Sequence, residues 1–376
     1  MANIQRRKVQ VKDSSGRIRT VTRYRVRYRD WAGVEHGETF KRSGEAERRK
    51  AQVETELDGG TWRDPKRGEI RLDQWAKDWI ETRHDLRATT RARLDTTMRM
   101  QVLPKFGKLP LIKISNAAVR AWVAEMLASG LSAASARKAV FALRHCLEAA
   151  VADGRLMTNP AAKVPLPSER AKAPRYLSQT EVETLVDAMQ ARYRALVLVG
   201  AFGGLRWGEA AGLTRAGVDV RRSRIIVTST AVEIGGKITL GNEPKTRRSK
   251  RSVPVARAVM GEIEEHLRRH VGPESDALVF TGPRGGPMFR ATFSQQAWRP
   301  AAKKAGLSGV TFHSLRHSFV AILVAAGCNV REVSEWAGHS SVAFTLTRYG
   351  GLFEDGSDAA VDRLDNLLGG GDDMGP

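Results

Sequence analysis

Basic, imidazole and phenol side chains gather between residues 312 and 351 of this 376-residue chain. His313, Arg316 and His317 open a predicted helix, and spacings of three and four residues place them on one side of its first turn. His339 and Tyr349 follow, the tyrosine just before two glycines that predict a segment able to move. Arginine holds two phosphate oxygens, histidine transfers protons near neutral pH, and tyrosine can be a covalent nucleophile. Together these residue types indicate attack on a phosphate.

Two other interpretations fit a stretch this short. A His–Arg pair is usually a surface or capping feature, and the i, i+4 spacing of His313 and His317 is also that of zinc ligands. Arg316 lies between the two histidines, however, and the glutamate of the HExxH zinc motif is absent. We therefore expect no metal, and the choice between phosphate chemistry and a surface feature depends on the rest of the chain.

Two further motifs lie upstream. In GAFGGLRWGEAAGL, Arg206 follows two glycines and the apolar run Ala195–Phe202, and EPKTRRSKRSVPV is a basic hairpin that carries Lys245. An arginine in a glycine-bounded bend, a lysine on a basic hairpin, then H-x-x-R-H, G-H and a tyrosine, in this order over residues 206–349, resembles the tyrosine recombinase (phage integrase) family. The order of five motifs is far more specific than any one of them.

The resemblance implies a role for each matching residue. The activating set would be Arg206, Lys245, His313, Arg316 and His339, with Glu209 as an accessory group that orients rather than reacts. Tyr349 would attack a backbone phosphate, giving a 3′-phosphotyrosyl link and a free 5′-hydroxyl. His313 would accept the proton, Lys245 would protonate the leaving oxygen, and positive charge around the phenol would favour its phenolate. The resemblance implies no metal and no cofactor, since the phosphotyrosine retains the bond energy for rejoining.

The charge balance of the chain agrees with a polyanionic partner. There are 62 Lys and Arg against 41 Asp and Glu, a net charge of +21, which predicts nucleic acid before membrane. The two cysteines, Cys146 and Cys328, lie in apolar surroundings and are predicted to be buried thiols, which argues against a disulfide scaffold or a structural zinc finger. No apolar run approaches the roughly 20 residues that span a bilayer. We expect a protein of the bacterial cytoplasm, associated with the nucleoid and not with a membrane.

Arginines alternate with packing residues near the N-terminus. This period of two predicts the middle strand of a three-stranded sheet, followed by a helix that Ser43 caps and that reaches Leu57. The resemblance implies that residues 1–60 bind arm-type DNA sites; a solvated edge strand is the alternative. The arginine face comprises Arg17, Arg19, Arg23, Arg25, Arg27 and Arg29, and the packing face Ile18, Tyr24, Val26 and Tyr28.

The remaining chain predicts three more parts, in an α+β fold that is mainly helical with small sheets. Residues 68–157 predict a small helical bundle whose second helix ends before Pro104 and whose third and fourth begin at Ser115 and Ser132; the resemblance implies that it is the core-binding domain. Residues 158–174 are a linker. Residues 175–376 form a mixed α/β catalytic domain, opened by the capping box Ser178–Glu181.

The catalytic domain is expected to hold a basic hairpin and an amphipathic tail. Strands at 224–228 and 252–255 would frame the hairpin, which enters a DNA groove with Arg247 and Arg248 beside Lys245. A tail helix is predicted to dock on its own domain or on a neighbouring subunit through one apolar stripe, made by Val361, Leu364, Leu367 and Leu368.

These features predict a site-specific DNA recombinase that integrates or excises a phage or mobile element. Its partners would be double-stranded DNA at core and arm sites, three further copies of itself in a tetramer, and DNA-bending and excision factors that the sequence does not identify. Two alternatives stay open. One is a type IB topoisomerase-like nicking-closing enzyme, and the other a non-catalytic architectural DNA-binding protein, which would not require the tyrosine.

Overall fold

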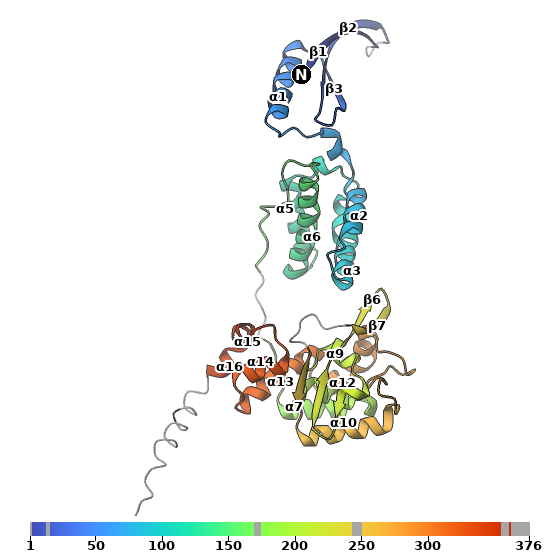
Figure 1. Ribbon diagram of the computed structural model, residues 1–376, viewed down its shortest axis with the longest axis vertical. Helices are drawn as coiled ribbons and strands as arrows, with labels where there is room; N and C mark the ends of the chain where they lie inside the picture. The colour runs from blue at the N-terminus through green and yellow to red at the C-terminus, as the bar shows by residue number, and fades with distance from the viewer. Residues whose placement is uncertain (1, 13–15, 169–173, 243–249, 355–360, 362–376) are drawn as a thin grey trace, which may run out of the picture. The chain divides into compact units, whose positions relative to one another are not determined.

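The computed structural model describes residues 2–12, 16–168, 174–242, 250–354 and 361 (Figure 1). The chain divides into two compact units, Met1–Glu169 and Arg170–Pro376, called unit 1 and unit 2 below. Lys245, Arg247, Arg248 and all but the first residue of the predicted tail stripe lie outside the described residues.

Unit 1 begins with a three-stranded antiparallel sheet of strands β1 (Asn3–Lys12), β2 (Ile18–Arg29) and β3 (Glu35–Phe40). The strand order β1-β2-β3 confirms that the arginine-rich strand is the middle one. Helix α1 (Ser43–Asp58) packs on the sheet over a small core that includes Val26, Tyr28 and Trp62. The prediction that Ser43 caps this helix is wrong. The N-cap position is Arg42, and Ser43 is already helical, with its hydroxyl donating to Glu47.

The second part of unit 1 is a helical bundle with its own apolar core. Ser115 and Ser132 cap the third and fourth long helices, as predicted. The second helix does not end before Pro104, because a π-helical turn leads into a last helical turn in which proline takes an early position. A proline is tolerated there since its missing N–H would find no intrahelical partner. The elements are η1 (Pro65–Glu69), α2 (Leu72–Thr82), α3 (Ala88–Thr97), η2 (Met98–Val102), α4 (Leu103–Phe106), η3 (Leu111–Lys113), α5 (Asn116–Ala128) and α6 (Ala133–Ala152).

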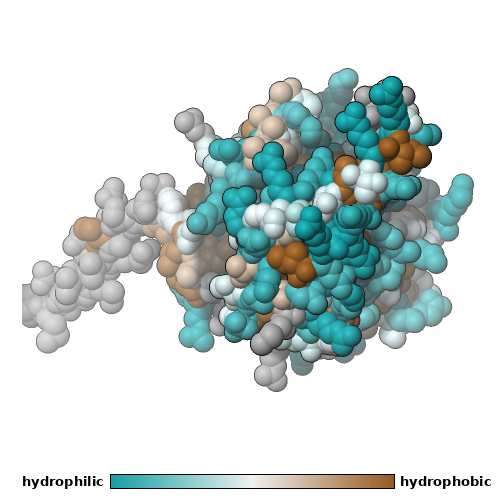
Figure 2. Space-filling view, turned by 90° about the horizontal axis from the view of Figure 1, so that it is seen from above, coloured by the Kyte–Doolittle hydropathy of each residue, from teal (hydrophilic) through white to brown (hydrophobic). Residues whose placement is uncertain are grey.

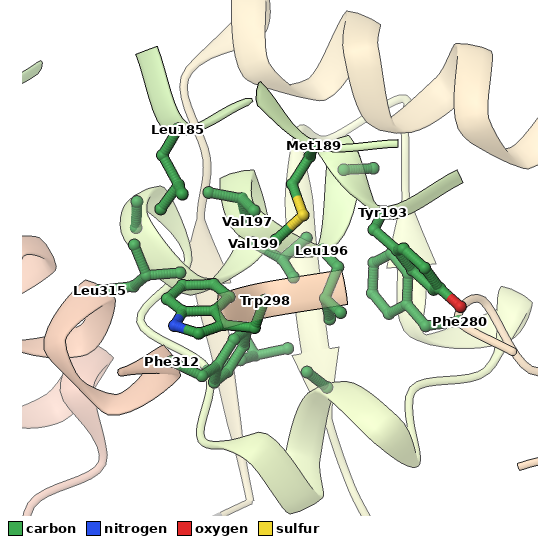
Figure 3. Close-up of a cluster of buried hydrophobic side chains, with 14 of the residues drawn as sticks. Leu185, Met189, Tyr193, Leu196, Val197, Val199, Phe280, Trp298, Phe312 and Leu315 are labelled. Carbon is green, nitrogen blue, oxygen red and sulfur yellow. The ribbon is translucent and has the colours of Figure 1, made fainter. Parts of the chain in front are cut away.

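Unit 2 is built around helix α8 (Ala191–Phe202), whose side chains are buried on nearly every side. Helices α7 (Gln179–Ala188) and α13 (Phe312–Ala325) pack against α8. The apolar core of unit 2 includes Leu196, Trp298 and Leu315 (Figure 3). The capping box of Ser178 and Glu181 at the start of α7 is confirmed. The other helices are α9 (Trp207–Ala211), η4 (Arg215–Gly217), α10 (Arg257–His270), α11 (Arg290–Phe293), η6 (Ser294–Trp298), α12 (Arg299–Lys304), α14 (Val330–Ala337), α15 (Val342–Tyr349) and α16 (Gly351–Glu354).

Two small antiparallel sheets complete unit 2. Strands β4 (Val218–Asp219), β5 (Arg224–Val227) and β8 (Arg251–Pro254) form one sheet, in which β5 pairs directly with β8. Strands β6 (Thr230–Ile234) and β7 (Lys237–Asn242) form the second sheet, a hairpin that lies between β5 and β8 in the sequence and packs on α9. The sequence reasoning missed this hairpin. The expected α+β class, mainly helical with small sheets, is confirmed.

The surface is mostly hydrophilic on the face shown in Figure 2, where hydrophobic residues occur singly or in small groups. Among the described residues, no helix has both the length and the apolar character needed to cross a bilayer. Cys146 is buried, as predicted, but Cys328 is only half-buried, because it follows the end of α13 near the surface.

Candidate active site

Arg316 lies at the centre of the candidate site. It projects from α13 and is only 2% exposed. Its Nη1 donates to the carbonyl of Gly204 at 2.6 Å and its Nη2 to the carbonyl of Ala337. Burial, followed by the charges of Arg206 and Arg251, lowers the pKa of Arg316 to about 9. A cation held this far from water interacts strongly with any anion that reaches it.

Arg206 approaches from the other side of the site. It occupies the N-cap position of α9, where its backbone N–H and its Nη1 donate to Glu209, each at 2.8 Å, and its Nη2 donates to the carbonyl of Gly338 at 2.7 Å. The bend before it requires Gly204, whose φ is +60° and where a Cβ would lie 2.2 Å from the ring of Phe319. The glycine-bounded bend noted in the sequence therefore fixes the direction of this arginine.

Glu209 joins Arg206 to Arg251, a buried arginine that the sequence reasoning missed. Nη1 and Nη2 of Arg251 donate to the two carboxylate oxygens at 3.0 and 2.9 Å. Burial alone would raise the pKa of Glu209, but the hydrogen bonds and charge of Arg251, with the charge of Arg206, lower it to about 2. Glu209 is therefore ionised at neutral pH and acts by orienting its arginine partners.

The C-terminal end of α14 is where the arginines meet. Three successive carbonyls, those of Trp336, Ala337 and Gly338, accept from Arg251, Arg316 and Arg206 respectively. Unpaired carbonyls and the negative end of the helix dipole favour cations at this position. Gly338 caps α14 in the left-handed conformation, with φ +62°, which glycine adopts more readily than other residues.

His339 follows this helix end and is buried, with 4% of its surface exposed. Its Nδ1 shares a hydrogen bond of 2.7 Å with the hydroxyl of Thr345, and its ring stacks on Tyr349 with centroids 5.7 Å apart and planes 6° apart. Burial, then the charges of Arg316, Arg206 and Arg251, lowers the pKa of His339 to about 3. The imidazole is therefore neutral at pH 7.

Tyr349 ends α15 and is 4% exposed. Its hydroxyl lies 2.7 Å from Nδ1 of His317. The histidine in contact with the phenol is therefore His317, whereas the sequence had suggested His313. Burial, then the charges of His313, Arg348 and Arg316, lowers the pKa of His317 to about 4, so a neutral imidazole can accept the phenol proton.

The expectation that positive charge favours the phenolate is wrong for this arrangement. Burial raises the pKa of Tyr349 and outweighs the lowering by Arg316 and Arg348. Desolvation disfavours the charged form of a phenol, and for Tyr349 this effect is larger than that of the neighbouring positive charges.

His313 is exposed at the edge of the site, with its ring 4.7 Å from that of His317. Desolvation by the surrounding protein, followed by the charge of Arg316, lowers its pKa. The structure thus brings together Arg206, Glu209, Arg316, His339 and Tyr349 of the predicted set, with His313 beside them. It adds His317 and Arg251. His317 could have been found from the sequence, because it is the last residue of the H-x-x-R-H motif. Nothing in RSVPV distinguishes Arg251 from a surface arginine. Among the described residues, no group of three His, Cys, Asp or Glu could hold a metal ion.

The predicted arginine face, of which Arg17 precedes β2 and the other five residues lie on it, has a different environment. Arg17, Arg19 and Arg29 are exposed, and Arg23, Arg25 and Arg27 are half-buried. Arg27 pairs with Glu35 on the neighbouring strand at 2.5 Å, and the guanidinium of Arg25 lies over Gly37, where a Cβ would be 2.8 Å from its Nε. Of the predicted packing face, Val26 and Tyr28 are buried, whereas Ile18 is 64% exposed beyond the end of the sheet core.

Comparisons with known proteins agree with this geometry. The sequence profile of the phage integrase family matches residues 175–354, and that of the phage integrase N-terminal SAM-like domain matches residues 72–127. The chain is 31% identical to tyrosine recombinase XerD of Mycobacterium leprae (strain TN) over 58% of this chain and 69% of the relative. It is 29% identical to the integrase of Mycobacterium phage D29 over 76% of this chain and 78% of that one.

Solved structures share the fold. The Tn1549 transposon integrase in complex with transposon right end DNA has a TM-score of 0.65 at 22% identity, covering 78% of this chain and 99% of that one. A lambda integrase dimer bound to a core site has a TM-score of 0.57 at 14% identity, covering 73% of this chain and 97% of that one.

Proposed function

Since the chain belongs to the phage integrase family and is a tyrosine site-specific recombinase, we propose that it cuts and rejoins DNA through a covalent link to Tyr349. The observation that supports this most is the convergence of Arg206, Arg316 and His339 around a tyrosine whose hydroxyl contacts a neutral histidine. Two fixed cations, a neutral hydrogen-bonding imidazole and a phenol with a proton acceptor are the groups that phosphoryl transfer requires.

In the proposed cleavage step the phenol oxygen attacks the scissile phosphorus while the bond to the 5′-oxygen breaks. The proton of the phenol passes to His317, which we assign in place of His313 because its Nδ1 already lies 2.7 Å from the hydroxyl. Negative charge grows on the non-bridging oxygens, so Arg206 and Arg316 stabilise the transition state more than the ground state. The products are a 3′-phosphotyrosyl ester and a 5′-hydroxyl.

Three other groups complete the proposal. Lys245, outside the described residues, protonates the leaving 5′-oxygen. His339, held by Thr345, donates a hydrogen bond to the phosphate, and its neutral form retains one ring N–H for this purpose. His313, which the sequence predicted as the proton acceptor, lies at the exposed edge of the site, and we propose that it contacts the phosphate instead. No metal and no cofactor enter these steps.

The proposed partners follow from the charge of +21 and from the relatives. The Tn1549 and lambda integrases were solved on DNA, and a lambda integrase tetramer was solved on a Holliday junction. We propose double-stranded DNA as the substrate, a tetramer as the active assembly, and integration or excision of a phage or mobile element as the outcome. Residues 1–60 would bind arm sites, residues 68–157 the core site and residues 175–376 would carry the chemistry, joined by a linker at 158–174.

Replacing the nucleophile tests the proposal. Tyr349→Phe should bind core-site DNA, recovered from the sequence that flanks the reading frame, with little loss of affinity. It should give no protein–DNA adduct that survives SDS. Tyr176→Phe is the matched control, because its ring lies 6.5 Å from that of Tyr349 and it should form the adduct normally. An adduct formed by Tyr349→Phe would remove Tyr349 from this role.

A further inference from the structure

Arg251, at the start of β8, is a buried arginine that has no role in the proposed steps. The residue is 8% exposed. Its Nη1 and Nη2 grip the two oxygens of Glu209, and its Nε donates to the carbonyl of Trp336 at 2.7 Å. The guanidinium thus faces a carboxylate on one edge and a helix end on the other. Any effect of Arg251 on the phosphate has to pass through these neighbours.

Glu209 transmits the position of Arg251 to Arg206. Each of its oxygens accepts twice: Oε1 from the guanidinium groups of both arginines, and Oε2 from Arg251 and the backbone N–H of Arg206. Without Arg251, only the hydrogen bonds from Arg206 would hold the carboxylate, and it could rotate about its last bonds. Arg206 would then lose a fixed partner on the side away from the phosphate.

The contact with Trp336 adds a second fixed point. The next two carbonyls along the chain hold Arg316 and Arg206, so a shift of the end of α14 moves the acceptors of both arginines. A Cβ at Gly338 would lie 3.0 Å from Nη1 of Arg251, which shows how closely the arginine fits under this turn. Arg251 therefore connects β8, α9 and α14 at the point where the catalytic arginines meet.

We propose, on the basis of the function above, that Arg251 is a positioning residue for strand cleavage, which holds Glu209 and thereby sets where Arg206 meets the scissile phosphate. A purely structural role is the competing explanation. Buried ion pairs add little net stability over apolar groups of similar size, so stability alone is a weak reason for this arrangement. Positioning has a large effect, because a shift of about 1 Å in a catalytic group can cost on the order of 100-fold in rate.

The test is single-turnover cleavage of a nicked core-site duplex at saturating protein. Arg251→Ala should cleave about 100-fold more slowly than wild type, and Arg251→Lys, which keeps the charge but not the two-pronged grip, about 10-fold more slowly. DNA affinity in a mobility-shift assay should change by less than about 3-fold for both. The control is Arg222→Ala, which removes an exposed arginine paired with Asp219 in the same unit and should cleave at the wild-type rate.

A double-mutant cycle separates positioning from stability. In an Arg206→Ala background, Arg251→Lys and Arg251→Ala should each slow cleavage by less than about 3-fold, since the group they position is gone. An equal loss in both backgrounds, or a wild-type rate for Arg251→Lys, would overturn the proposal. If Arg251→Ala does not fold, Arg251→Lys decides the question alone. Absence of any adduct with wild-type protein would instead overturn the proposed function, and this inference with it.

Discussion

Arginines occur in two different environments in this protein, one on strand β2 and the other in the candidate active site of unit 2. On β2 they alternate along a strand and are exposed or half-buried, and Arg27 pairs with Glu35 on the neighbouring strand. In unit 2, Arg206, Arg251 and Arg316 converge on three successive carbonyls at the end of α14.

The difference indicates two uses of one side chain. An exposed arginine offers charge to a phosphate backbone, its contribution is screened by salt, and its neighbours can replace it. A buried arginine is held in one place by acceptors on both sides, so it can stabilise charge that appears at a single point, and no neighbour can replace it. We therefore expect substitutions of Arg206, Arg251 or Arg316 to change rates and substitutions of arginines on β2 to change affinity.

The strongest test of this comparison is Arg316→Ala. Because Arg316 is 2% exposed and faces the proposed phosphate site, its loss should slow single-turnover cleavage on the order of 1000-fold, with DNA affinity nearly unchanged. Arg316→Lys, which is less disruptive to the fold, should still lose most of the rate. Arg331→Ala, an exposed arginine on α14, is the control and should cleave normally. A large loss of affinity with an unchanged rate would place Arg316 with the β2 arginines.

His317→Ala sharpens the comparison by removing the group that contacts the phenol. If His317 accepts the proton, cleavage should slow by about 100-fold at neutral pH. His270→Ala, an exposed histidine on α10, serves as the control. Since the pKa of His317 is about 4, the wild-type rate should show no loss of the base between pH 8 and pH 6. A wild-type rate for His317→Ala would mean that the hydrogen bond between His317 and Tyr349 has no part in the proton transfer.

Stability should depend on pH in unit 2 because burial lowers the pKa values of two histidines in the candidate site. The folded pKa values of His317 and His339, about 4 and about 3, lie below the ordinary 6.5. The unfolded chain therefore binds protons first, and stability that is complete above pH 6.5 is lost as the pH falls toward those values. Between pH 7 and pH 5 each of these two histidines should lower the free energy of unfolding by at most about 2 kcal/mol, which gives at most about 4 kcal/mol for the two together.

Hydrogen exchange of α13 and α15 amides would measure this dependence directly. His317→Asn should make it smaller, because one of the histidines with a lowered pKa is then absent. The same dependence in His317→Asn and in wild type would show that other groups cause it.

The smallest expected effect is that of one arginine on β2. Arg23→Gln should weaken binding to DNA that flanks the core site by about 3-fold and reduce the slope of log affinity against log salt by about 1. Its cleavage rate on a core site should not change. Mobility shifts at several salt concentrations measure the slope. An unchanged slope, or a slower cleavage step, would contradict the separation between affinity on β2 and rate in unit 2.

Local patterns in the sequence were sufficient for several features of the fold. The structure confirms the period of two on β2 and the caps at Ser115, Ser132 and Ser178, each of which is set by a few neighbouring residues. Local rules failed at Ser43, where the helix starts one residue earlier, and at Pro104, where a π-helical turn lets the helix continue.

The sequence by itself determined which side chains could do chemistry and in what order they occur, because residue type and motif order are one-dimensional properties. Tertiary structure alone decided how they meet. Arg206 finds its acceptor at Gly338, 132 residues away, and Arg316 finds Gly204, 112 residues away. It also decided that Arg251 is buried, that His317 rather than His313 contacts Tyr349, and that burial raises the pKa of this phenol. These properties depend on which distant carbonyls and charges replace water around a group, and spacing along the chain carries no information about that.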